Sequence, residues 1–136
     1  DVWHCDADGV YSGTPEAGAH GRARKFLRGY QLSDAGGAAR FTTIYPGWYP
    51  GRAIHVHFKV RARTAAGHGV EFTSQLYFDE AVNARVMAMP PYAARGPHRV
   101  RNASDGLFRR GGPLLVVAAS PHGEGYAAAF DIGLRV

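Results

Sequence analysis

Two histidines one residue apart are the first feature of this sequence that could do chemistry. They are His55 and His57, in the stretch GWYPGRAIHVHF that covers residues 47–58. The end of the stretch alternates like a strand, and side chains two positions apart on a strand point to the same face. Both imidazoles would then lie about 6–7 Å apart along that face. The pattern is a natural pair of metal ligands, although two independent histidines bonded to water or carbonyls would give the same sequence.

The other residues near this pair narrow the choice of metal. Cys5 is the only cysteine, so the chain has no Cys-x-x-Cys zinc motif and no internal disulfide. No glutamate follows the histidine pair on its strand. The nearby oxygen donors are phenols: Tyr49 stands six residues before His55, and Tyr11 follows the DADG turn. A phenol, with a free pKa of about 10, ionises near neutral pH only beside a strong Lewis acid. Ferric iron, which is hard and highly charged, is the obvious candidate.

These side chains must be positioned by strands, because short alternating runs separated by turn signals dominate the sequence. With 18 glycines and 8 prolines, the pattern predicts an all-β fold, a β-sandwich of mostly antiparallel strands with long loops and one short helix. The run PLLVVAAS is continuously apolar, which predicts a strand buried on both faces. The turn SDAGG predicts a hairpin between the two segments that flank it. The expected strands are residues 1–5, 26–32, 39–46, 53–62, 70–78, 113–120 and 126–136.

One helix is expected over residues 80–89, ending before Pro90. Asp79 is a suitable N-cap for it. The segments 12–20 and 91–112 have loop compositions. Asp6–Gly9 has the D-x-D-G start of a calcium loop without the rest of that pattern, which favours a tight turn.

Length and charge restrict the class of protein. The 136 residues predict a single domain, residues 1–136, without repeats or linkers. No run of about 18 apolar residues predicts a membrane span. The net charge is +5, but the basic residues are dispersed and no nucleic-acid motif accompanies them. We therefore expect neither a nucleic-acid partner nor a membrane partner.

Four blocks, DVWHCDADGVYS, IYPGWYP, GRAIHVHF and TSQLYF, together resemble the intradiol ring-cleavage dioxygenases. These are non-haem iron(III) enzymes that open catechols between the two hydroxyl groups. The blocks stand in the family's order and run from Asp1 to about Phe78, over half of the chain. The resemblance implies that Tyr11, Tyr49, His55 and His57 are the iron(III) ligands, with Tyr49 and His55 axial.

The same resemblance implies catalytic roles for Arg52, Tyr49 and Gln75. Arg52 would stabilise negative charge that develops on the ring and on oxygen, and it cannot serve as a base because it stays protonated. Tyr49 would be both a ligand and the group that takes a catechol proton. Gln75 offers a donor and an acceptor, and would orient Arg52 or a substrate oxygen. Taken singly, these residues have ordinary alternatives. Arg52 would also suit an exposed cation, Tyr49 a surface aromatic in a loop, and Gln75 a solvent-facing amide on a strand.

The function implied is iron(III)-dependent intradiol cleavage of catechol-type aromatics with O₂, giving cis,cis-muconate-type products. The partners would be small catechols and O₂. The N-terminal part of the family domain is expected to be missing, and the chain resembles the short, often exported members, which favours secretion over the cytoplasm. The preferred catechol and the oligomeric state are left open.

An alternative function belongs to another class. A β-sandwich with exposed Trp48, Tyr49 and Tyr92 would suit a non-catalytic carbohydrate- or protein-binding module. Its histidine pair would then be incidental or bound to zinc.

Overall fold

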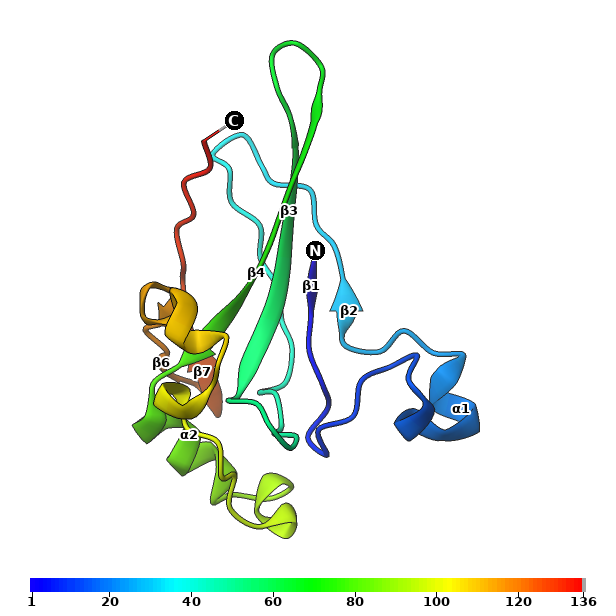
Figure 1. Cartoon of the computed structure of the whole chain (residues 1–136), viewed down its shortest axis with the longest axis vertical. Helices are drawn as coiled ribbons and strands as arrows, with labels where there is room; N and C mark the ends of the chain where they lie inside the picture. The colour runs from blue at the N-terminus through cyan, green and yellow to red at the C-terminus, as the bar shows by residue number, and fades with distance from the viewer. Residues whose placement is uncertain (136) are drawn as a thin grey trace.

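Two long antiparallel strands, β3 (His55–Arg63) and β4 (Gly69–Phe78), form the centre of the chain (Figure 1). The computed structural model describes residues 1–135, apart from the side chains of Ala19 and His20. β-Branched and aromatic residues alternate with polar ones along both strands, the composition that a pleated, half-buried surface favours. The turn between the strands is closed by Thr64, whose N–H donates to the His68 carbonyl at 2.9 Å. Both strands confirm the expectation for 53–62 and 70–78.

Three shorter strands complete the main sheet. β1 (Val2–Trp3) pairs antiparallel with both β3 and β2 (Arg28–Gly29), and β5 (Val116–Val117) adds in parallel to β4. The order across the sheet is β2-β1-β3-β4-β5. A separate hairpin sheet consists of β6 (Ser120–His122) and β7 (Gly125–Ala127). The predicted all-β class, with mostly antiparallel strands arranged as a β-sandwich, is confirmed.

Helix α2 (Glu80–Met87) lies at the end of the β3–β4 hairpin opposite its turn (Figure 1). Asp79 is its N-cap, as predicted, and its carboxylate accepts a hydrogen bond from the Ala81 N–H at 2.8 Å. The helix buries Val82, Val86 and Met87 against Ile54, the residue that precedes β3. This small apolar cluster anchors the beginning of β3 next to the helix.

The expectation that residues 12–20 and 91–112 are loop without helical turns is wrong in part. Helix α1 (Gly18–Arg22) and several 3₁₀ helices form within the segments predicted as loops. Pro15 and Pro113 stand in the first turn of two of them, where a fixed φ and a missing N–H cost nothing. None of the helices within residues 1–135 has the length and apolar character needed to cross a membrane. The 3₁₀ helices are Pro15–Ala17, Tyr92–Arg95, Asn102–Ser104, Phe108–Arg110 and Gly112–Leu115.

The predicted hairpin of 26–32 with 39–46 is also wrong. Its turn forms, since the Asp34 N–H donates to the Ala38 carbonyl at 2.9 Å, but only Arg28–Gly29 becomes a strand and it pairs with β1. Every residue from 28 to 44 is exposed. Because this segment has no apolar surface to cover, alternation in its sequence does not lead to pairing.

Strand lengths near both ends of the chain were overestimated. The segment 1–5 forms a strand only at Val2–Trp3. The segment 113–120 begins as a 3₁₀ helix in which Leu114 is 84% exposed, so it is not a strand buried on both faces. In the segment 126–136 pairing stops at Ala127, and Val136 lies outside the described residues.

Removing the N-cap of α2 tests how much this helix contributes to stability. We expect Asp79→Ala to lower the free energy of unfolding by about 1 kcal/mol, because the Ala81 N–H loses its acceptor. Urea unfolding followed by circular dichroism measures the change. Asp131→Ala, at an exposed position outside any helix, is the control and should change stability by less than about 0.5 kcal/mol. Equal effects of the two substitutions would contradict the cap.

Candidate metal centre

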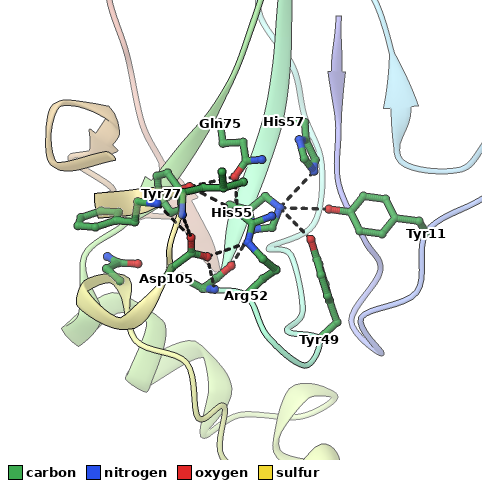
Figure 2. A network of polar contacts seen from close by, with 12 residues as sticks. Tyr11, Tyr49, Arg52, His55, His57, Gln75, Tyr77 and Asp105 are labelled. Atoms are coloured by element: carbon green, nitrogen blue, oxygen red, sulfur yellow. Dashed lines mark hydrogen bonds and ion pairs between the residues drawn. The ribbon is translucent and has the colours of Figure 1, made fainter. Parts of the chain in front are cut away.

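The register of β3 against β4 brings four polar side chains to one face of the sheet. His55 stands opposite Tyr77, and His57 stands opposite Gln75. Residues directly opposite in an antiparallel pair share a face, so both imidazoles, the Gln75 amide and the Tyr77 phenol lie together (Figure 2). On the side of β3 away from β4, Trp3 of β1 pairs with His57 and stacks on its ring at 4.9 Å between centroids. The shared face predicted for the two histidines is therefore present.

Two interlocked loops bring the phenols to this face. Asp6–Gly9 is a tight turn, as predicted, in which the Asp6 carboxylate accepts from the Asp8 and Val10 N–H groups. The second loop touches it where the Gly47 N–H donates to the Asp6 carbonyl at 3.0 Å. A side chain at Gly47 would collide with the Asp6 and Ala7 carbonyls, so only glycine permits this approach. Tyr11 and Tyr49 follow these two turns.

Cys5 lies at the same junction. Its thiol is 1% exposed and donates to the Gly47 carbonyl at 3.4 Å. Burial raises the pKa of the thiol to about 11. Cys5 therefore acts as a small buried residue at this junction.

Four donor atoms converge at the centre of this face. The Nε2 atom of His55 lies 3.1 Å from the Tyr49 hydroxyl, 3.4 Å from the Tyr11 hydroxyl and 3.1 Å from His57 Nε2 (Figure 2). The other nitrogen of His55, Nδ1, lies 2.7 Å from the Ala53 carbonyl, to which it must donate. In the neutral ring this leaves Nε2 unprotonated, with its lone pair on the side of the two phenol oxygens and His57 Nε2. The four predicted ligand residues are thus brought together.

Burial sets the charge of these groups. Desolvation lowers the pKa of His55 to about 4 and that of His57 to about 3, and the Arg52 cation adds to both effects. Desolvation also raises the pKa of Tyr11 and Tyr49. Near neutral pH the imidazoles are therefore unprotonated donors, whereas the phenols keep their protons unless a cation lies close to them.

The chemistry of the donor set fits a hard, highly charged cation. Two phenol oxygens and two imidazole nitrogens surround one point, and a cation there would reverse the burial penalty on both phenolates. Iron(III) meets these requirements. Within residues 1–135 no three His, Cys, Asp or Glu side chains cluster as a metal site.

Arg52 belongs to a polar network beside the four donors. Its Nη2 donates to the Gln75 side-chain carbonyl at 2.5 Å, and the Tyr77 hydroxyl donates to the same oxygen at 2.9 Å. Its Nε donates to the Asp105 carboxylate at 2.8 Å. The contact between Arg52 and Gln75 agrees with the orienting role expected of the glutamine.

Asp105 and Tyr77 are site residues that the sequence did not indicate. Asp105 lies in a loop, 53 positions after Arg52, with no motif around it. Burial acts to raise the pKa of its carboxyl, but the hydrogen bonds from Ala53, Phe108 and Arg52 outweigh it and lower that pKa to about 2. The position of Tyr77 follows from the β3–β4 register, which places it opposite His55.

The aromatic residues of the alternative function do not form an exposed platform. Trp48 and Tyr92 pack against the core cluster, and the Arg95 guanidinium lies 4.4 Å from the Trp48 ring centroid. The hydroxyl of Tyr92 donates to the Tyr45 carbonyl at 2.7 Å. Trp48, Tyr49 and Tyr92 are all only partly exposed, which corrects the expectation of an open aromatic surface.

Comparison with known proteins gives matches among solved structures. The chain is similar to an intradiol ring-cleavage dioxygenase from Tetranychus urticae, with a TM-score of 0.78 and 30% sequence identity over 93% of this chain and 65% of that chain. It is also similar to a dioxygenase of known crystal structure, with a TM-score of 0.75 and 31% identity over 88% of this chain and 61% of that chain. The chain thus spans less than two thirds of either protein. No protein-family model and no curated protein sequence matches it.

The lowered pKa of His57 predicts acid sensitivity of the metal-stripped protein. Between pH 6.5 and about 4 this histidine is protonated in the unfolded chain but not in the folded chain. As the pH is lowered through this range, each such histidine therefore reduces the free energy of unfolding by about 1.4 kcal/mol per pH unit. We expect His57→Gln to reduce this slope in urea unfolding experiments. The exposed His68→Gln is the control and should leave the slope unchanged. A His57→Gln protein with the wild-type slope would contradict the assigned charge state.

Proposed function

Because the chain is similar to intradiol ring-cleavage dioxygenases, we propose that it belongs to their family and cleaves catechol-type aromatics with O₂ between the two hydroxyl groups. The products would be of the cis,cis-muconate type, and the cofactor one non-haem iron(III) ion. The observation that carries this proposal is the convergence of Tyr11, Tyr49 and His57 on His55 Nε2, at 3.1–3.4 Å. The resemblance seen in the four sequence blocks agrees with the structural neighbours.

Tyr11, Tyr49, His55 and His57 would hold the ion. Two phenolates and one hydroxide balance the three charges of iron(III), which favours the ferric state over the ferrous one. When bound, the metal supplies the Lewis acidity that ionises phenols near neutral pH and draws electron density from the aromatic ring. Because His55 is 2% exposed and fixed through Nδ1, its Nε2 is a preorganised ligand.

Three side chains of the protein would act on the substrate. The Tyr49 oxygen would take a catechol proton. The Arg52 charge opposes the rise that burial causes in the Tyr49 pKa, and so favours the phenolate form of Tyr49 that would hold the metal. The Arg52 guanidinium would stabilise negative charge that develops on the ring and on the incoming oxygen. Gln75 would hold Arg52 in place through its side-chain carbonyl.

The overall reaction balances without any further reagent. The bond between the two hydroxyl-bearing carbons breaks, and each oxygen atom of O₂ ends in a new carboxyl group. The catechol supplies all four electrons that O₂ accepts, so no external reductant is required.

Oxygen consumption distinguishes this function from that of a binding module. Protein of known iron content should consume one O₂ per catechol in an oxygen electrode, with matching growth of muconate absorbance. Protein that contains stoichiometric zinc and no iron, or that holds iron without turnover on a panel of catechols, would refute the proposal.

Substitution of the phenols tests the ligand set. The iron protein should be coloured by charge transfer from phenolate to iron(III), and Tyr11→Phe or Tyr49→Phe should shift or bleach that band. Turnover should fall at least about 100-fold in each variant, because an anionic ligand or the proton acceptor is lost. Tyr30→Phe, which changes a 73% exposed phenol, is the matched control and should keep both colour and turnover. A band that persists in both ligand variants would reject these phenols as ligands.

A further inference from the structure

We propose that Asp105 is a positioning residue that fixes Arg52 and the backbone support of His55 through a single carboxylate oxygen. The inference rests on the proposed function of the metal centre, since it assigns Asp105 an effect on turnover. Asp105 would touch neither substrate nor metal, and would act through its two neighbours.

The carboxylate of Asp105 is fully buried and fully bonded. Its side chain is 0% exposed, and its Oδ1 accepts the Leu107 and Phe108 N–H groups at 2.7 and 3.0 Å. These two bonds fix the carboxylate within its own loop. The second oxygen, Oδ2, therefore has a defined position relative to the sheet.

The first contact of Oδ2 orients the arginine. Arg52 Nε donates to it at 2.8 Å, while Nη2 donates to Gln75. Contacts at two different nitrogens fix the orientation of the planar group. Without the carboxylate, the long Arg52 side chain would keep only the contacts to Gln75 and Tyr77 and could rotate away from the donors.

The second contact of Oδ2 supports the histidine. The Ala53 N–H donates to Oδ2 at 2.9 Å, and the carbonyl of the same residue accepts from His55 Nδ1 at 2.7 Å. This carbonyl selects the tautomer in which Nδ1 carries the proton and Nε2 has a lone pair available for a metal. One oxygen atom thus sets the position of the Arg52 guanidinium relative to His55.

A mutant cycle on the iron-loaded enzyme tests the assignment. Asp105→Asn should keep bound iron, because the four ligand side chains are unchanged, and lower kcat with catechol by about 10–100-fold. Arg52→Gln alone should lower kcat at least as much. The double variant should lose clearly less than the product of the two single losses, because Asp105 acts in part through Arg52. Effects that multiply, or a kcat for Asp105→Asn within twofold of the wild type, would overturn the proposal.

A second readout does not depend on activity. In ¹⁵N NMR spectra the Arg52 Nε–H should give a signal protected from solvent exchange, and Asp105→Asn should abolish that protection. Glu80→Gln is the matched control: Glu80 accepts the Asn102 N–H at 2.6 Å and so holds the same loop from its other side. It should reduce stability yet keep the protected signal and keep kcat within about twofold.

The two proposals fail in different ways. A wild-type protein without oxygen uptake would refute the proposed function, and the NMR signal would still test the position of Arg52. An active wild type whose Arg52 signal is unprotected, or unaffected by Asp105→Asn, would refute only the role of Asp105.

Discussion

The pairing of β3 with β4 is the constraint on which the rest of this structure depends. It places His55 opposite Tyr77 and His57 opposite Gln75, and a slip of one residue would turn the side chains of the slipped strand to the other face. Phe58, on that other face, is 4% exposed, so a slipped register would expose apolar surface and bury polar groups. The hydrophobic pattern that selects the fold therefore also selects the composition of the polar face.

The remaining parts of the site are held next to this pair of strands by hydrogen bonds between segments far apart in the sequence. The approach of Gly47 to Asp6 joins the two loops that carry the tyrosines. The contact of Asp105 with Arg52 and Ala53 joins a distant loop to the beginning of β3. Each junction satisfies polar groups that are removed from water, which makes the site rigid. The same burial shifts the pKa of both imidazoles and both phenols. A bound cation would reverse the shift on the phenols.

Sequence alone was sufficient where a local pattern carried the structure. The alternation around His55 and His57, the turn at Asp6–Gly9 and the cap at Asp79 all depend on neighbouring residues, and each is present. It failed where pairing depended on partners far along the chain: residues 39–44 alternate but are all exposed, and the apolar run 113–120 begins as a 3₁₀ helix. Asp105 could not be found because its significance arises only from contact with Arg52, more than fifty positions away.

The state of Cys5 has a consequence for the proposed chemistry. Catechols that escape cleavage oxidise in air to ortho-quinones, and these electrophiles add to thiolates on proteins. With a pKa of about 11 and 1% exposure, the one cysteine of this chain carries almost no thiolate near neutral pH. The protein therefore presents no reactive thiol to the quinones that form from its candidate substrates, and we expect Cys5 to stay unmodified for as long as the fold persists.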